Sequence, residues 1–299
     1  MSILVVGTVA LDTVKTPFGK KKDILGGSAT FFSLAARLFS PVNLVAVVGR
    51  DFPEKHIRFL KEKGIDLSGL AVEKGKTFRW EGEYGWDFSN PRTLATHLNV
   101  LSGFNPQIPE KYKKSDYVFL ANIDPRIQMK ALREMRKPRV VACDTMNFWI
   151  ENRRKALLEL LKRIDIFFLN ESEARQLTGE PNLVRAARGI RKMGPSRIIV
   201  KKGEHGSILF SDHSVFCTPA YLLESIFDPT GAGDTFAGGV MGYLATRKKP
   251  GRLALREAVV YGNIMATFAV EGFGPGRVGK ISRRDISRRF RQFRRITSL

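Results

Sequence analysis

Short runs of consecutive apolar residues alternate with longer segments of helical periodicity along most of the chain. Continuous apolar runs are typical of parallel strands that helices cover on both faces. Six such runs are expected to form strands: Ile3–Val6, Asn43–Val48, Tyr117–Leu120, Arg139–Cys143, Ile164–Leu169 and Arg197–Lys201. The segments between them predict helices over 28–39, 53–63, 126–136, 151–162, 171–178 and 182–193. This order predicts a doubly wound α/β sheet, in which ligands bind beyond the carboxyl ends of the strands.

Two segments depart from this alternation. Residues 71–101 show no good helical pattern, and we expect a small β excursion there that covers a ligand as a lid. Its aromatic residues Phe78, Trp80 and Trp86 suit an apolar part of a substrate such as a nucleobase. Packing within the lid or a dimer contact explains them equally, and we favour that reading for Trp86. Residues 207–218 predict a hairpin with Ser211 and Asp212 near its turn.

Composition restricts the class of protein. A chain of 299 residues with 43% hydrophobic and 26% charged residues is neither disordered nor fibrous, and we expect one domain over 1–299 with the lid at about 71–101. Cys143 and Cys217 are the only cysteines, which excludes a disulfide framework. The apolar stretches are interrupted before they reach the length of a membrane span, and no basic segment precedes the first one. We therefore expect a cytoplasmic protein without a membrane partner.

The chain is strongly basic. Fifty Lys and Arg residues against 29 Asp and Glu residues give a net charge of +21, which is compatible with a polyanionic partner or with a solvated basic surface. We favour the solvated surface. The last segment, 280–299, holds eight Lys and Arg residues, and four apolar residues recur in it at helical spacing: Ile286, Phe290, Phe293 and Ile296. A terminal helix docked by its apolar face is expected, and binding of a membrane surface or a nucleic acid is the alternative.

Residues 228–239 carry the strongest chemical signal, with the sequence DPTGAGDTFAGG leading into an apolar helix that reaches about Ala245. Glycines allow the backbone to approach a ligand closely, and the free N–H groups at a helix start favour a phosphate. Asp234 stands among these amides, where its carboxylate would repel a phosphate. We therefore expect Asp234 to accept the proton of an attacking hydroxyl. A helix-capping role explains Asp234 taken alone, but the whole segment favours chemistry.

This segment resembles the second signature of the PfkB family of carbohydrate kinases. The resemblance extends over nearly the whole chain, because other elements of the family follow in the expected order: Gly26 and Gly27 before a helix, Gly49 to Asp51, Asp144 with Asn147, Asn170 to Glu173, and Lys202 to Gly206. It implies a ribokinase-like three-layer sandwich with a mostly parallel central sheet and a small β lid. It also implies ATP-dependent phosphoryl transfer to a hydroxyl of a sugar or sugar derivative.

The resemblance assigns roles to these positions. It implies that Asp234 is the general base and that the amides of Gly231, Ala232 and Gly233 form the anion hole. It further implies Mg²⁺ positioned by Asn170 and Glu173 through water, as suits an ion that keeps several of its waters. In relatives an aspartate at position 228 helps to hold a monovalent cation such as K⁺, although a turn role explains Asp228 equally well. The remaining implied contacts are with the substrate, through Asp12, Gly26, Gly27 and Asn147, and with ATP, through Lys202, Gly203, Gly206 and Asn263.

Two departures from ribokinases bear on the substrate. Ribokinases carry Asn where this chain has Ala10 and Lys where it has Ser28, so ribose itself is an unfavoured substrate. A nucleoside kinase of the same family is the alternative. A nucleic-acid-binding or regulatory protein on a kinase-like body is an alternative of another class, against which the presence of Asp234 argues. Because lid strands in relatives pair between subunits, a homodimer through the lid is also expected.

Overall fold

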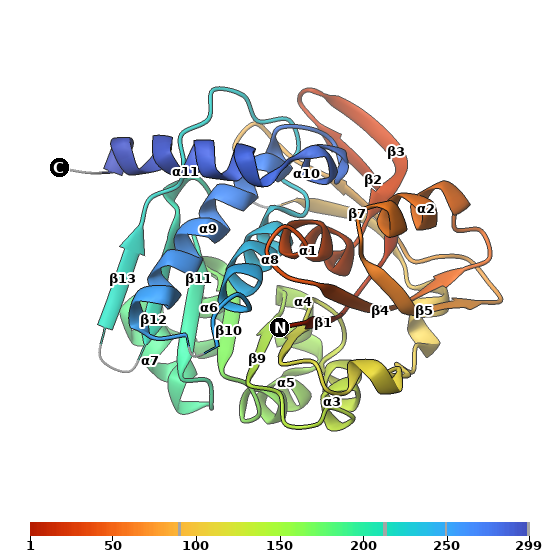
Figure 1. The fold of residues 1–299 in the computed structure, drawn as a ribbon, viewed down its shortest axis with the longest axis horizontal. Coiled ribbons are helices and arrows are strands. Elements are labelled where there is room, and N and C mark those ends of the chain that lie inside the picture. The colour runs from red at the N-terminus through yellow and green to blue at the C-terminus, as the bar shows by residue number, and fades with distance from the viewer. Residues whose placement is uncertain (89–90, 212–213, 249, 298–299) are drawn as a thin grey trace.

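A nine-stranded sheet forms the centre of the computed structural model, which describes residues 1–88, 91–211, 214–248 and 250–297 (Figure 1). The strand order is β13-β12-β11-β10-β9-β8-β1-β4-β5. All pairings from β11 to β5 are parallel, and β12 and β13 add an antiparallel hairpin at one edge. The strands of this sheet are β1 (Ile3–Val6), β4 (Val42–Gly49), β5 (Asp66–Glu73), β8 (Tyr117–Leu120), β9 (Val140–Asp144), β10 (Ile166–Asn170), β11 (Arg197–Lys201), β12 (Ser207–Ser211) and β13 (Ser214–Thr218).

Helices cover both faces of this sheet, as the alternating pattern predicts. Successive residues of a strand point to opposite faces, so Ile3 and Val5 of β1 belong to one apolar core and Leu4 and Val6 to the other. The first core is closed by α1 (Ser28–Ala36), α2 (Glu54–Glu62), α8 (Ala232–Leu244) and α9 (Arg252–Val270). The second is closed by α3 (Pro125–Arg133), α4 (Asn147–Asn152), α5 (Arg154–Leu161), α6 (Glu171–Thr178) and α7 (Leu183–Lys192). The ribokinase-like three-layer arrangement is confirmed.

Helix α9 is long and apolar enough to cross a membrane by length and composition. In the fold it lies along α8, and glycines allow the two backbones to approach closely. A Cβ on Gly262 would lie 2.6 Å from the Val240 side chain, and one on Gly239 would lie 2.8 Å from the Met265 side chain. The apolar composition of α9 is therefore explained by its place in the core.

A second sheet of four strands, in the order β3-β2-β6-β7, forms the lid beside the main sheet (Figure 1). Strands β6 (Arg79–Glu83) and β7 (Arg92–His97) come from the predicted excursion. The other two, β2 (Ala10–Thr16) and β3 (Gly19–Gly26), come from a segment for which we predicted no strand, and residues 71–73 belong to β5 of the main sheet. The lid is thus assembled from two distant parts of the chain. The exposed first half of β3 is lysine-rich and lacks the apolar run that marks a buried strand.

Other boundaries differ for local reasons. The helix expected over 151–162 is two helices, because the backbone breaks at Arg153 with φ of −136° between α4 and α5. The hairpin over 207–218 is present, and Asp212 lies outside the described residues. Helices α10 (Gly276–Lys280) and α11 (Arg283–Thr297) end the fold. Helix α11 buries Ile286 and Phe293, whereas Ile296, which we expected on the docked face, is 52% exposed.

Candidate active site

The start of α8 presents backbone N–H groups beyond a glycine turn. Gly231 has φ of +75°, and a Cβ there would lie 2.4 Å from the Phe31 ring, so only glycine fits this position without strain or overlap. The N–H of Ala232 donates to the Pro229 carbonyl at 3.1 Å. Within the described part of the chain, no hydrogen-bond partner is present for the N–H groups of Gly233 and Asp234. They remain available to an anion at the positive end of the helix dipole.

Asp234 occupies the first turn of α8. Burial is the main cause that raises the pKa of its carboxyl group to about 7, and the negative charge of Asp144 adds to it, whereas Lys201 opposes it. A carboxyl group with a pKa near 7 can both hold and release a proton near neutral pH, which suits a general base. This pKa suits a general base, and the role of Asp234 as the base stays a prediction.

A buried charge cluster lies behind this turn, at the carboxyl ends of three parallel strands. The Lys201 ammonium group at the end of β11 lies 2.7 Å from Oδ2 of Asp144 at the end of β9. Burial by itself would lower the pKa of Lys201, but the carboxylates of Asp144 and Glu173 outweigh it and raise the pKa above its ordinary value. A Cβ on Gly233 would lie 3.1 Å from the Lys201 Nζ atom. A fixed positive charge thus lies directly beside the first turn of α8.

Asn170 and Glu173 form a capping box at the start of α6. The Asn170 side chain accepts from the Glu173 N–H at 2.9 Å, and Glu173 Oε2 accepts from the Asn170 N–H at 2.7 Å. Burial raises the pKa of Glu173 to about 7, against the opposing charge of Lys201. Since these oxygen atoms already accept hydrogen bonds, the pair fits a hydrated Mg²⁺ held through water better than a directly coordinated ion. Among the described residues, no group of three His, Cys, Asp or Glu side chains has the arrangement of a metal site.

Asp12 of β2 lies against the glycine pair that precedes α1. Its carboxylate is so close to Gly26 that a Cβ there would lie 1.9 Å from Oδ2. Gly27, with φ of +96°, precedes α1, and its backbone N–H is one of the groups that act on the pKa of the Asp12 carboxyl group, which it lowers. Burial, with the charges of Asp228 and Asp234 as lesser causes, raises the pKa of Asp12 to about 7. Asp12, Asp228 and Asp234 are therefore close enough for their charges to interact.

Asp228 is fully buried and holds two loops together. Its Oδ1 atom accepts from the Thr230 N–H at 2.9 Å, and its Oδ2 atom accepts from the Gly274 N–H at 3.1 Å. Burial raises the pKa of Asp228 above its ordinary value. Asp228 therefore stabilises the turn at 228–230, which is one of the two roles that the sequence suggests for it.

The residues expected to bind ATP surround the turn after β11. Lys202 donates its N–H to the Gly206 carbonyl at 2.8 Å, and Gly203 and Gly206 both have positive φ angles. A Cβ on Gly206 would lie 2.1 Å from the Thr218 carbonyl, so the turn needs glycine to lie against β13. Asn263 of α9 donates to Ser207 Oγ at 3.1 Å and to the Pro219 carbonyl at 3.4 Å. Asn263 therefore fixes the loop that follows β13.

Residues that we expect near the substrate also make contacts within the protein. Asn147 donates to Gln176 Oε1 at 2.5 Å, so its amide group is held against α6. In the lid, Trp80 covers Gly82 and donates to Thr93 Oγ1 at 3.2 Å, and Trp86 is 78% exposed. Phe78 packs against the second core. Trp80 and Phe78 thus pack within the lid and against the core, whereas Trp86 is exposed, and the nucleobase contact suggested for these residues stays a prediction.

Comparison with known proteins agrees with this geometry. The model of the pfkB family carbohydrate kinases matches residues 6–279. This chain belongs to the PfkB family. It is 32% identical to the cytidine kinase of Thermococcus kodakarensis over 246 residues, covering 81% of this chain and 87% of that one. It is 26% identical over 302 residues to the nucleoside kinase of Methanothermobacter thermautotrophicus, covering 91% and 90% of the two chains. A putative ribokinase II from E. coli, solved with ATP and Mg²⁺, has the same fold with a TM-score of 0.81, 21% identity and coverage of 97% and 99%.

The protein is accordingly an ATP-dependent PfkB kinase that phosphorylates a sugar or a nucleoside. The family and its relatives favour a kinase over the other class of function that the sequence left open, a nucleic-acid-binding or regulatory protein. Asp12, Asp144, Glu173, Lys201 and Asp234 come from separate parts of the chain and interact through their charges, near the carboxyl ends of β9 and β11 and the start of α8. That is the edge at which doubly wound sheets bind ligands.

Two residues of the candidate site are not among those that the sequence indicates. The sequence predicts Lys201 only as the end of a strand, and it predicts Tyr84 only as part of the lid segment 71–101. A lysine ending a buried strand is unusual enough to have signalled a paired charge. Tyr84 had no such signal, because the lid position that buries it depends on tertiary structure.

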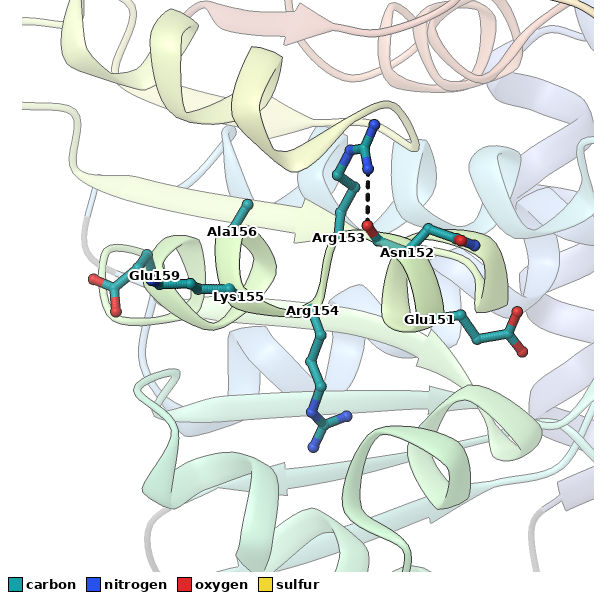
Figure 2. Close-up of a pocket in the computed structure, with 7 residues that line it drawn as sticks. All are labelled: Glu151, Asn152, Arg153, Arg154, Lys155, Ala156 and Glu159. Carbon is teal, nitrogen blue, oxygen red and sulfur yellow. Dashed lines mark hydrogen bonds between the residues drawn. The ribbon is translucent and has the colours of Figure 1, made fainter.

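A pocket between α4 and α5 lies apart from these residues. Figure 2 shows Arg153 and Arg154 pointing in opposite directions from this junction, with Arg153 donating to the Asn152 carbonyl at 2.9 Å. Arg153 also donates to Asp124 Oδ2 at 3.2 Å, and Arg154 donates to the Leu177 carbonyl at 2.7 Å. The two arginines therefore join α5 to α3 and α6, which is a role in helix packing.

Proposed function

We propose that this kinase transfers the γ-phosphoryl group of ATP to a ribose hydroxyl of a nucleoside. The observation that carries the proposal is the closeness of Asp12 and Asp234 at a helix start where, in the described part of the chain, the N–H groups of Gly233 and Asp234 have no hydrogen-bond partner. Asp12 would accept hydrogen bonds from neighbouring hydroxyls of the acceptor, and Asp234 would deprotonate the attacking hydroxyl. The similarity to a cytidine kinase and a nucleoside kinase favours a nucleoside over the free sugar.

The reaction requires one proton transfer and one exchange of bonds to phosphorus. Asp234 takes the proton of the attacking hydroxyl while the hydroxyl oxygen bonds to the γ-phosphorus. The bond from the γ-phosphorus to the bridging oxygen breaks, and ADP is released. The negative charge on the transferring group is stabilised by the N–H groups of the 231–234 turn and by Lys201 beside Gly233. Acceptor hydroxyls would be oriented by Asp12, which lies against Gly26 and next to Gly27. Asn147, whose amide nitrogen donates to Gln176, would offer its amide oxygen to the sugar.

ATP lies against the turn after β11 in this proposal. The backbone of Lys202, Gly203 and Gly206 approaches the phosphates, since glycine leaves no side chain in the way. Asn263 positions the loop at Pro219 that borders the base. A bound Mg²⁺ would neutralise phosphate charge, and Asn170 and Glu173 would hold its water shell.

A monovalent cation and a dimer remain part of the proposal. Asp228 would support K⁺ indirectly, by fixing the loop carbonyls around 228 and 274 through its two N–H contacts. The lid strands would pair between two subunits, which sedimentation or light scattering tests directly. We further propose that the enzyme works in the cytoplasm, where ATP and nucleosides meet.

The deciding experiment is a screen of acceptors for ADP release. Cytidine, the other ribonucleosides, deoxycytidine, ribose, hexoses and a keto-deoxy acid are each added with ATP and Mg²⁺. We expect the highest kcat/KM with a ribonucleoside, and a lower value with deoxycytidine than with cytidine because Asp12 loses a hydroxyl partner. A response to hexoses or ribose alone would assign the free sugar as substrate, which is the second candidate.

A further inference from the structure

Tyr84 connects the lid to the turn that begins α8. It follows β6, and its backbone N–H donates to the Lys15 carbonyl of β2 at 2.9 Å, so both lid segments hold it. Its side chain leaves the lid and is buried against the body, where its hydroxyl accepts from Thr230 Oγ1 at 3.4 Å. Burial, and then the charges of Asp228, Asp12 and Asp234, raise the pKa of Tyr84, so the phenol stays protonated.

A second contact joins the lid to the same segment. Phe18, in the turn between β2 and β3, packs on Phe227 with ring centroids 5.6 Å apart. Phe227 is itself fixed to the body, because its N–H donates to the Val270 carbonyl at 2.8 Å. The lid therefore contacts residues 227–230 at both ends of that segment.

This segment runs directly into the candidate anion hole. The Thr230 N–H is fixed from inside by Asp228 at 2.9 Å, and the Thr230 hydroxyl is fixed from the lid side by Tyr84. The next residue is Gly231, whose left-handed conformation starts α8. Since only a few backbone angles separate Thr230 from the N–H groups of Gly233 and Asp234, a change at Thr230 alters where those groups point.

We propose that Tyr84 is a positioning residue for phosphoryl transfer, which through Thr230 holds the 231–234 turn in its anion-binding arrangement while the lid lies on the body. This rests on the proposed function, in which that turn stabilises the transferring group. Tyr84 then links acceptor binding under the lid to the geometry at the phosphorus atom. A lid that is displaced releases Thr230 and with it the turn.

Kinetics of Tyr84→Phe test the link, because this change removes one hydroxyl and keeps the ring. We expect kcat to fall about fivefold, the cost of one hydrogen bond, with the KM for ATP unchanged. Thr230→Val should give the same fall, and the double variant no further fall, because both remove one interaction. Tyr112→Phe is the matched control: Tyr112 is a buried tyrosine whose hydroxyl donates to the Asp66 carbonyl at 3.1 Å, at the far edge of the main sheet. Its kcat should not change.

Hydrogen exchange gives a readout that needs no substrate. Peptides covering 227–235 should exchange faster in Tyr84→Phe and in Phe18→Ala than in the unaltered protein, and at the original rate in Tyr112→Phe. Unchanged exchange together with additive kinetic effects in the double variant would overturn the proposal. Faster exchange in a protein that phosphorylates neither sugars nor nucleosides would instead remove the proposed function and leave the link in place. If Tyr84→Phe failed to fold, Thr230→Val and Phe18→Ala would decide by the same exchange measurement.

Discussion

Lys201 and Asp144 form an ion pair inside the protein, with 2.7 Å between Nζ and Oδ2, at the ends of two parallel strands. Their side chains are 18% and 3% exposed. Removing water from two charges is costly, and breaking such a pair leaves an uncompensated buried charge. The pair lies beside Gly233, where the proposed reaction gathers negative charge. In the proposed function, this positive charge would allow a site that holds Asp144, Glu173 and Asp234 to accept the phosphates of ATP as well.

Lys201→Met should shift the pH dependence of kcat to higher pH. Three carboxyl groups from three elements face Lys201: Asp144 of β9, Glu173 of α6 and Asp234 of α8. Without the cation that opposes its rise, the pKa of Asp234 increases and more of the base is protonated near neutral pH. The pH–rate profile measures this, with Lys201→Arg expected to keep the original profile. Lys162→Met, which removes an exposed lysine paired with Glu159 at 2.7 Å, is the control. An unchanged profile in Lys201→Met would show that Lys201 does not act on the base.

Asp234→Asn should lower the rate of ADP formation by about a thousandfold, as expected when a general base is lost. Asparagine has nearly the same shape and cannot accept the proton. Binding of ATP, measured by calorimetry, should change little, because the amides and the β11 turn remain. Asp116→Asn, which removes a partly exposed carboxylate paired with Arg139 at 2.7 Å, should leave both quantities as they were. Turnover of Asp234→Asn near the original rate would exclude Asp234 as the base.

The stability of the fold should decrease as pH rises from about 4 to about 7. Asp12, Glu173 and Asp234 have pKa values raised to about 7 in the folded protein, above their ordinary values of 3.8, 4.5 and 3.8. In this window the folded state therefore binds more protons than the unfolded chain. The contribution of each group to the stability of the folded state is lost as the pH rises through the group's pKa in the folded state. Asp234→Asn removes one of these groups. The difference in Tm, variant minus original protein, should therefore be more positive at about pH 8 than at about pH 4. Thermal unfolding at both pH values measures this, and an equal difference at the two would contradict a raised pKa of Asp234.

Gly231→Ala should inactivate the enzyme and destabilise it more than a matched glycine change. Gly231 and Gly64 both have φ of +75°, so alanine costs each position about 1 kcal/mol of backbone strain. Nothing lies within 4 Å of a Cβ on Gly64, whereas the Cβ on Gly231 would overlap the Phe31 ring. Denaturant unfolding should therefore show a larger loss for Gly231→Ala than for Gly64→Ala. Only Gly231→Ala should lower kcat, and equal losses in stability would show that the Phe31 contact is unimportant.

The sequence predicts those elements of the fold and the site that depend on residues close together in the chain. Continuous apolar runs identified six parallel strands, because a strand buried on both faces needs apolar residues at every position. The 228–239 segment predicted the turn and the start of α8, because glycine favours turns and aspartate is common at helix starts. Strands β2 and β3 were not predicted, because β2 has only a short apolar sequence interrupted by polar residues and β3 begins with exposed lysines. Their pairing with each other and that of β2 with β6 are formed by the tertiary structure.

What the sequence by itself determined is the fold class, the family and the identity of Asp234 as the candidate base, all encoded within short contiguous segments. Tertiary structure alone decided that Lys201 joins Asp144 and Glu173, that Asp12 lies near Asp234, and that Tyr84 reaches Thr230. Each of these relationships joins residues far apart in the chain. Their physical basis is burial, which removes water from the charges and makes the protonation of each carboxyl group depend on its neighbours.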